Sequence, residues 1–327
     1  MKRIFLLVFF LSCLPERDNP YDPNSDFFQK KTVLLGVCQN RTGVPIPDCW
    51  IKILPIRGNN SYLAKSDERG RYEIKDCPAE SILVIGEKEG FVPESIYRYP
   101  QVYKYETLNF ILEGLPKFLN YAVFSSFVSR HIPRDSCVLN LRCELRDEEG
   151  QGDINQVFGI IEGLSDTLPL FFKSGFTYEN FFLEKSLSQN LEEISGRNLY
   201  LVAWDIFGHY AQSPPLRLIR VIRNPPEPIS PLGGDSVSCR PSFFWHLPQY
   251  PFSYTQFLEI YLIRPNLEPI LYLRYDTLSP ADTSFFLSES LISGYYYWQV
   301  GAKDTYNNWA KSAEAVFRVG IPEKYAF

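Results

Sequence analysis

The sequence lacks several features on which common classes of protein depend. It has one methionine and three histidines in 327 residues, and no run of lysine and arginine outside its first three residues. With a formal net charge of −5, this argues against a nucleic acid as partner, because a phosphate backbone selects clustered cations. The apolar run Ile4 to Leu11 has eight residues, far short of the roughly 20 that a helix needs to cross a bilayer.

Motifs of catalytic and metal sites are also missing. Neither Cys-x-x-Cys nor His-x-x-x-His occurs, and His131, His209 and His246 are far apart in the chain, so no zinc site is indicated. There is no Gly-x-Ser-x-Gly elbow, no phosphate loop and no dinucleotide fingerprint. The sequence therefore predicts a protein that is not an enzyme and that has no cofactor.

What the sequence does contain is material for packed β domains. Apolar residues make up 45% and aromatic residues 16% of the chain, which is typical of a folded protein. The 25 prolines and 19 glycines favour many short elements joined by turns. At about 150 residues per domain the length fits two domains, or three of the small all-β kind.

The first residues have the pattern of a signal peptide. Lys2 and Arg3 precede the apolar run, which ends at Ser12-Cys13. Phe10-Leu11-Ser12-Cys13 resembles the bacterial lipobox, with Phe10 in place of the usual Leu. The resemblance implies cleavage before Cys13 and lipidation of that cysteine, whose several acyl chains would anchor the protein stably. The alternative is an ordinary secreted protein in which Cys13 is incidental.

The segment after Cys13 has the composition of a tether. Three prolines and four acidic residues fall within Leu14 to Asp26, so the segment cannot bury a hydrophobic face. Its Asn-Pro-Tyr-Asp-Pro-Asn-Ser core resembles segments that follow the lipidated cysteine in many Gram-negative surface lipoproteins. Under the sorting rule of those lipoproteins, Leu14 in place of Asp implies the outer membrane, at its periplasmic or its cell-surface face.

From Thr32 the segment after the tether alternates as a β-strand does, with Val33, Leu35 and Val37 sharing one parity. It also resembles the carboxypeptidase regulatory-like family, a seven-stranded prealbumin-like sandwich without catalytic residues. The resemblance rests on Gly36-x-Val-x-Asn40-x-x-Gly43-x-Pro45-Ile46-Pro47-Asp48-Cys49, on Ser66-Asp67-x-x-Gly70-x-Tyr72-x-Ile74 and on Gly90-Phe91. Cys77-Pro78-Ala79-Glu80 stands where that family usually has Pro-Gly.

A proline-rich linker at Asn224 to Pro228 opens the last domain. Phe243 to Trp245 and Phe257 to Tyr261 are predicted to form paired strands, and Gly294 to Asp304 a long central strand. Tyr296, Trp298, Val300 and Ala302 then share one face. The pattern resembles the bacterial branch of the fibronectin type III family, with Trp245 as the core tryptophan.

The middle segment repeats the end of the last domain. Ala203, Asp205, Ala211 and Ser213 each lie 99 residues before Ala302, Asp304, Ala310 and Ser312. This spacing is the length of one immunoglobulin-like sandwich, so the middle domain is interpreted as a diverged copy of the last. A helix is predicted only within Tyr178 to Ile194.

The predicted fold class is therefore all-β: three tandem β-sandwich domains (prealbumin-like, Ig-like and fibronectin type III-like) after a lipobox signal peptide. The predicted segments are the signal peptide 1–12, the lipidated cysteine and tether 13–30, the carboxypeptidase regulatory-like sandwich 31–115, the Ig-like sandwich 116–224, the fibronectin type III-like sandwich 225–320 and a tail 321–327.

The remaining cysteines are predicted to be packing residues. Cys137 and Cys143 share a strand parity with the leucines between and after them, which indicates a core-facing stripe. Cys38, Cys49 and Cys77 fall where the resembled family is apolar, so burial as free thiols is favoured. In an exported protein a bridge from Cys49 to Cys38 or to Cys77 is the alternative.

Few residues are candidates for binding a ligand. Asp205 and Asp304 are expected to fix hairpin turns by accepting backbone amide hydrogen bonds, with calcium binding as the alternative. The tether acids Asp18, Asp22 and Asp26 with Asn24 offer a second possible calcium site. An aromatic stripe of one parity could stack on sugars or pack on a neighbouring strand; it consists of Tyr97, Tyr99, Tyr103 and Tyr105.

Together these features predict a lipid-anchored, extracytoplasmic, non-enzymatic protein that displays a binding surface. Sandwich loops and edge strands favour a protein partner. The alternative is a carbohydrate-binding or glycan-uptake accessory lipoprotein.

Overall fold

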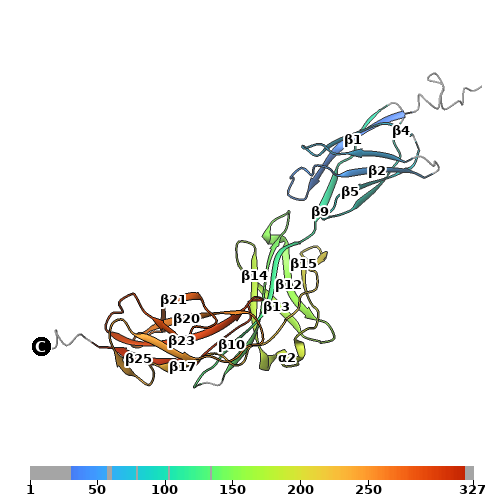
Figure 1. The fold of residues 1–327 in the computed structure, drawn as a ribbon. Coiled ribbons are helices and arrows are strands. Elements are labelled where there is room, and N and C mark those ends of the chain that lie inside the picture. The colour runs from blue at the N-terminus through green and yellow to red at the C-terminus, as the bar shows by residue number, and fades with distance from the viewer. Residues whose placement is uncertain (1–30, 57–60, 79, 102–103, 133–134, 321–327) are drawn as a thin grey trace, which may run out of the picture. The chain divides into compact units, whose positions relative to one another are not determined.

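The structure, a computed structural model, describes residues 31–56, 61–78, 80–101, 104–132 and 135–320 (Figure 1). The predicted signal peptide, Cys13, the tether and the tail lie outside these residues. The described chain is all-β, as predicted, and has three hydrophobic cores. It divides into two compact units: the first ends at Leu115 and also takes in Asp147–Asp153, and the second holds Pro116–Arg146 and the chain from Ile154 onward.

The first unit is a sandwich of two sheets. One has the order β4-β1-β9-β6 with β8 beside β1, and the other has the order β3-β2-β5-β7. On β1 the core face carries Leu34, Gly36 and Cys38; a side chain at Gly36 would stand 1.8 Å from the carbonyl oxygen of Leu108. The strands are β1 (Lys31–Asn40), β2 (Trp50–Pro55), β3 (Tyr62–Lys65), β4 (Arg71–Pro78), β5 (Ile82–Glu87), β6 (Phe91–Val92), β7 (Glu94–Arg98), β8 (Tyr105–Thr107) and β9 (Phe110–Gly114).

The second unit begins with another sandwich. Strand β13 joins its two layers, because its first half pairs with β12 and its second half with β14. The elements are β10 (Lys117–Val128), β11 (Ser136–Arg146), β12 (Ile154–Ile161), β13 (Thr167–Ser174), β14 (Thr177–Leu183), η2 (Glu184–Ser186), α2 (Leu191–Ile194), β15 (Leu199–Asp205) and β16 (Tyr210–Gln212). The short helix η1 (Gln151–Asp153), between β11 and β12 in the chain, belongs to the first unit.

The helix predicted within Tyr178 to Ile194 is wrong over most of its length. Strand β14 occupies the first part and pairs with both β11 and β13, so its backbone groups are satisfied by neighbouring strands. Only the single turn α2 is α-helical, and the side chain of Asn190 caps it by accepting a hydrogen bond from the amide of Glu193.

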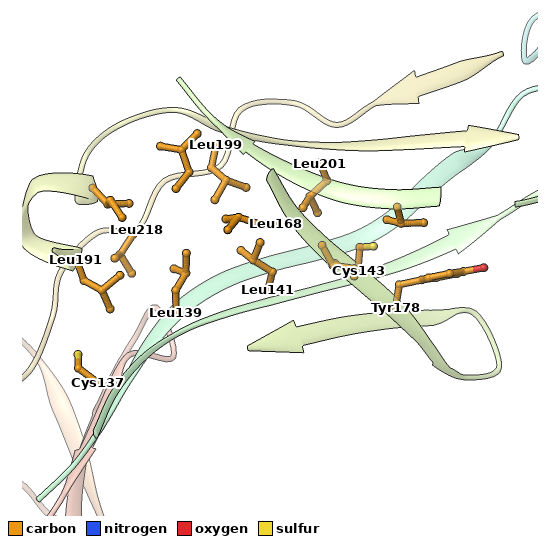
Figure 2. Packing of buried hydrophobic residues seen from close by; sticks show 14 of the residues in the cluster. Cys137, Leu139, Leu141, Cys143, Leu168, Tyr178, Leu191, Leu199, Leu201 and Leu218 are labelled. Carbon is orange, nitrogen blue, oxygen red and sulfur yellow. The ribbon is translucent and has the colours of Figure 1, made fainter. Parts of the chain in front are cut away.

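The core of this sandwich confirms the predicted stripe on β11 (Figure 2). Cys137 and Cys143 are 7% and 1% exposed, and the three leucines of the same parity are 1% exposed or less. They pack against β12, β13 and β15, where a side chain at Gly159 would stand 2.9 Å from Leu141. The alternation of apolar residues along β11 was therefore enough to identify its core face.

The third sandwich consists of two layers. One is the sheet β17-β19-β22, and the other contains β20, β21, β23, β24 and β25, with β18 paired to β25. Tyr296, Trp298, Val300 and Ala302 are fully buried on one face of β23, as predicted. Its strands are β17 (Glu227–Ser230), β18 (Asp235–Val237), β19 (Ser242–His246), β20 (Tyr254–Ile263), β21 (Ile270–Leu278), β22 (Ser284–Phe286), β23 (Gly294–Asp304), β24 (Trp309–Lys311) and β25 (Ala315–Val319).

The predicted pairing of Phe243 to Trp245 with Phe257 to Tyr261 is wrong. These segments form β19 and β20, which belong to opposite sheets. They meet through the core instead, where the indole N–H of Trp245 donates to Oε1 of Gln256 at 2.8 Å. Two apolar segments next to each other in sequence can face each other across a core as well as pair within a sheet.

The second and third sandwiches share one continuous sheet. Strand β10 pairs in parallel with β24, placing Ser126, Phe127 and Val128 opposite Trp309, Ala310 and Lys311. Ala310, a residue of the third sandwich, is part of the core of the second. This pairing explains why the two sandwiches form a single compact unit.

Candidate functional site

A cleft of about 780 Å³ in the first unit gathers three of the four predicted tyrosines. Tyr97 lies near the end of β7, an edge strand of one sheet, and Tyr105 begins β8, which belongs to the other sheet. Tyr99 lies in the loop after β7. Their exposed fractions are 70% for Tyr97, 77% for Tyr105 and 70% for Tyr99. These rings are therefore accessible to a ligand and are not a face packed on a neighbouring strand.

The four tyrosines do not form a stripe on one strand, because the chain leaves β7 after Arg98 and enters β8 only at Tyr105. Tyr103 lies outside the described residues. Three of the four predicted tyrosines therefore line one cleft, although they do not share one strand. Two sheet edges, not one strand, bring Tyr97 and Tyr105 to the same cleft.

Polar side chains surround the tyrosines. Arg98, Gln101, Lys104 and Glu106 line the cleft, and Nζ of Lys104 donates to Oε1 of Gln101 at 2.7 Å. The amide of Gln101 donates to Glu106, and its carbonyl accepts from Thr32, so the loop is tied to both β8 and β1. The result is a shallow, open concave surface on which exposed aromatic rings lie beside hydrogen-bonding side chains.

The repeated acids occupy matching turns. One oxygen of Asp205 accepts the amides of Phe207 and His209 at 2.8 and 2.9 Å. One oxygen of Asp304 accepts the amides of Tyr306 and Asn308 at the same two distances. Both aspartates are buried. Their geometry is that of turn-fixing side chains, and the 99-residue repeat extends to individual hydrogen bonds.

The two turns differ in what holds the second carboxylate oxygen. In Asp205 it lies 3.1 Å from Nδ1 of His209. In Asp304 it accepts from the side-chain amide of Asn308 at 2.9 Å and lies 3.1 Å from Nε of Arg220. Asn308 in turn accepts the amide of Ser125 on β10 at 2.8 Å, so this turn also joins the second and third sandwiches.

The six described cysteines are free, and all but Cys239 are buried. Burial raises the pKa of Cys137 to about 11 and that of Cys77 and Cys143 to about 12. Hydrogen bonding to Cys49 and burial raise the pKa of Cys38. A thiol with a raised pKa carries little thiolate at neutral pH and reacts slowly with alkylating reagents.

The hydrogen bond with Cys38 lowers the pKa of Cys49, but that thiol is fully buried and therefore protected from the reagent. Native alkylation at pH 8 is expected to modify one cysteine of the region after Cys13, namely Cys239. In a Cys13→Ser variant, which leaves six of the seven cysteines, mass spectrometry should show one adduct when native and six in denaturant. Fewer than six adducts in denaturant without reductant would show a disulfide, for which Cys38 and Cys49 are the first pair to test because their thiols are hydrogen-bonded to each other.

A second concave surface was not identified from the sequence. It lies on the outer face of the shared sheet, where cavities of about 380 and 400 Å³ have Phe124 and Arg142 in common. Phe171 and Phe181 stand there with 63% and 65% of their surface exposed. The only local signal was the pair of phenylalanine doublets at 171–172 and 181–182. These doublets do not predict a groove, because the groove depends on how the strands pair.

Among the residues that the structure describes, no helix is long and apolar enough to cross a membrane. Neither a family model nor a curated protein matches the chain.

The solved structures that resemble this chain have low sequence identity to it and low structural similarity. A proposed carbohydrate-binding protein from Bacteroides uniformis is 12% identical, with 58% of this chain and 99% of that one covered and a TM-score of 0.26. The major pilin subunit BcpA of Bacillus cereus is 6% identical over 90% of this chain and 97% of its own, with a TM-score of 0.32. The FN1–FN3 domains of chicken CNTN1 are 11% identical over 83% and 91%, with a TM-score of 0.33. Because all three scores lie below 0.5, the function is inferred from this chain's own residues.

Proposed function

We propose that this chain is a lipid-anchored, extracytoplasmic, non-enzymatic binding protein whose first unit binds carbohydrate in the tyrosine cleft. The observation that carries the proposal is the gathering of Tyr97, Tyr99 and Tyr105, each at least 70% exposed, in one concave surface. Three large aromatic side chains that stay exposed contribute no apolar burial to the stability of the fold. Such a cluster is expected where a ligand covers the rings.

A sugar suits this surface because it has both apolar and polar sides. The C–H faces of a pyranose ring can lie on tyrosine rings, and its hydroxyl groups can bond to Arg98, Gln101 and Glu106 at the rim. The function expected first from the sequence was binding of a protein partner. The cleft does not favour it, because an edge strand binds an extended peptide mainly through backbone hydrogen bonds, which do not require a cluster of exposed aromatic rings.

Replacing Tyr97 or Tyr105 by Ala is expected to weaken binding to the glycan selected on an array roughly 3- to 10-fold, the loss of one aromatic contact. Both side chains are more than two-thirds exposed, so the fold should be unchanged. Binding is measured by calorimetry on the region after Cys13. Tyr295→Ala, at an exposed tyrosine of the second unit (55% exposed), is the matched control.

An array on which the wild-type protein binds no glycan removes the carbohydrate function. Glycan binding that survives in the Tyr97→Ala, Tyr105→Ala double variant moves the site elsewhere. A protein partner would then be the better function, with β21 as the place to test: in the described chain it pairs only with β20, and it exposes Ile270 and Leu271.

The proposed anchor rests on Lys2, Arg3 and the Phe10-Leu11-Ser12-Cys13 segment. Cys13→Ser is expected to move the protein from the detergent phase to the aqueous phase in detergent partitioning, because the acyl chains are lost. The wild-type mature protein should begin at Cys13. If the wild type stays in the aqueous phase and retains residues 1–12, the anchor is wrong, whatever the tyrosine cleft binds.

A further inference from the structure

We propose that the second unit carries a separate site for an anionic polysaccharide, in the groove on the outer face of the shared sheet. The groove consists of the two adjoining cavities of about 380 and 400 Å³ that share Phe124 and Arg142. It is independent of the tyrosine cleft, which lies in the first unit.

Strand register builds the groove. Across β10, β11 and β14 one row holds Phe124, Asn140 and Phe181. The next row places Arg142 opposite Glu179 and Ala122. On the far side of β10, Trp309 of β24 stands opposite Ser126. Side chains from two sandwiches therefore line one face without an intervening break in the sheet.

Aromatic rings form the floor and walls. Phe171 and Phe181 are 63% and 65% exposed. At the other end Phe257 packs edge-on against Trp309, with ring centroids 6.2 Å apart. Gly301 permits this packing, because a Cβ there would lie 2.1 Å from the ring of Phe257. Phe257 is buried and supports Trp309 from behind, so the exposed rings of Phe171 and Phe181 are the ones that suit the apolar faces of sugars.

The charge of the groove is opposite to that of the chain. Four cationic side chains line it, Arg142, Lys173, Arg274 and Lys303, against the carboxylates of Glu179 and Glu259, whereas the whole chain has a formal net charge of −5. Local positive charge on an acidic protein indicates an anionic ligand.

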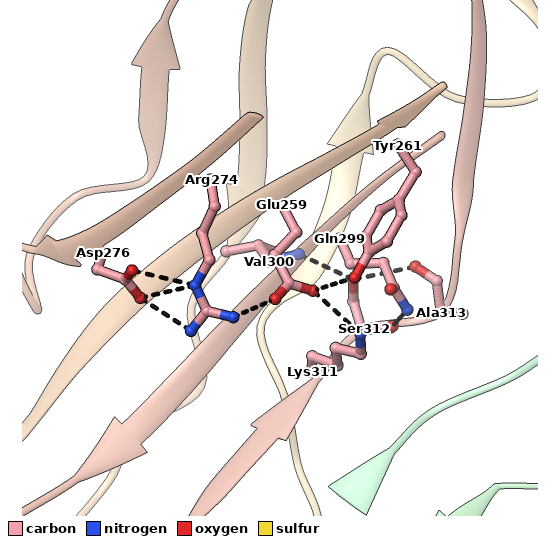
Figure 3. A network of polar contacts seen from close by, with 9 residues as sticks. All are labelled: Glu259, Tyr261, Arg274, Asp276, Gln299, Val300, Lys311, Ser312 and Ala313. Atoms are coloured by element: carbon pink, nitrogen blue, oxygen red, sulfur yellow. Dashed lines mark hydrogen bonds and ion pairs between the residues drawn. The ribbon is translucent and has the colours of Figure 1, made fainter. Parts of the chain in front are cut away.

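Two of the four cations are already held by carboxylates. Arg274 pairs with Glu259 and Asp276, and Glu259 also accepts from Lys311 and Tyr261 (Figure 3). Lys173 lies 3.2 Å from Glu179.

Arg142 and Lys303 are different. Within the described part of the chain no carboxylate lies at ion-pair distance from either, and Arg142 is exposed. These two side chains are available for carboxylate or sulfate groups of a ligand, and Arg142 can bind a carboxylate through two parallel hydrogen bonds.

The sheet favours a polysaccharide over an acidic peptide. Strands β14, β11 and β10 each pair on both sides, so their backbone groups are satisfied and cannot hold an extended peptide by strand addition. A polysaccharide binds through ring faces and acidic groups and needs no backbone partner.

The experiment measures binding of the region after Cys13 to a panel of uronate-containing and sulfated oligosaccharides, at low and at physiological salt. At least one acidic oligosaccharide should bind, and its neutral methyl ester or desulfated form should bind at least tenfold more weakly. Arg142→Gln with Lys303→Gln should weaken binding roughly tenfold at low salt and less at high salt. Phe181→Ser should weaken it roughly fivefold.

Matched controls come from the same unit. Arg318→Gln removes an exposed cation from β25, and Phe286→Ser removes a phenylalanine that is 65% exposed, as Phe181 is. Neither should change binding, and Tyr97→Ala in the first unit should not either. Circular dichroism of each variant checks the fold.

Three results would overturn the proposal: no acidic oligosaccharide binds, poly-glutamate or oligo-deoxythymidine binds as well as the best oligosaccharide, or the Arg142, Lys303 and Phe181 variants bind like the controls. Because Tyr97→Ala is tested in parallel, failure of this site and failure of the tyrosine cleft are distinguishable.

Discussion

Trp298→Ala is expected to lower the free energy of unfolding of the second unit by about 3 to 5 kcal/mol, the loss seen when a large core side chain is truncated. The indole is fully buried. Its ring lies 5.0 Å from that of Phe243 and 6.4 Å from that of Trp245, so truncation opens a cavity between the two sheets of the third sandwich. It also removes the hydrogen bond from Nε1 to the carbonyl of Pro231, at 2.7 Å.

Urea denaturation of the region after Cys13 measures the effect. The first unit has one tryptophan, Trp50, and the second has the other four of the five in the chain, so fluorescence mainly reports the second unit. Trp298→Phe should cost less, about 1 to 2 kcal/mol, because the ring is kept and only the hydrogen bond and some volume are lost. Trp204→Ala, at a tryptophan of the second unit that is 37% exposed, is the control, and an equal loss in that variant would contradict the assignment of the core.

Asp304→Ala is expected to destabilise the second unit by about 3 kcal/mol, because the groups that face the carboxylate would be left without it. Two backbone amides and the side-chain amide of Asn308 donate to this carboxylate, and Nε of Arg220 lies 3.1 Å from it. Because Asn308 also accepts from Ser125, the variant should loosen the junction between the second and third sandwiches.

The internal repeat supplies the matched comparison. Asp205→Ala removes the same two amide partners but only one side-chain partner, His209, and should cost about 1 to 2 kcal/mol. Hydrogen exchange should show faster exchange at β10 and β24 in Asp304→Ala and not in Asp205→Ala. Equal losses of stability with no change at β10 would show that Asp304 only fixes its own turn.

Short-range pattern predicted much of the architecture. The stripe on β11 and the face of β23 were identified because side chains alternate between the two sides of a strand, and a continuous alternation of large apolar residues has one interpretation. The pattern was misleading on β1, where the alternation was assigned to Val33, Leu35 and Val37 although apolar residues occupy both parities, and the structure leaves these three side chains only partly buried. The core face of β1 carries Leu34 and Cys38. Gly36 lies on the same face, where the backbone of Leu108 comes too close for any side chain.

The segment from Tyr178 to Leu183 shows where local pattern fails. The helix was predicted over Tyr178 to Ile194 because Phe182, Leu187, Leu191 and Ile194 are roughly in helical register. In the structure the edges of β11 and β13 instead provide backbone partners on both sides of the segment up to Leu183. Tertiary pairing outweighs a weak local preference, because an unpaired buried backbone group costs more than the difference in propensity.

By itself, the sequence determined the all-β class, the core-facing residues of the clearest strands and the paired turns at Asp205 and Asp304, since each depends on residues near one another in the chain. Only the tertiary structure decided which surfaces could bind a ligand. Tyr97 meets Tyr105 across two sheets, and Arg142 meets Trp309 across the strand pairing of two sandwiches. Such sites arise from long-range register, which no local pattern encodes.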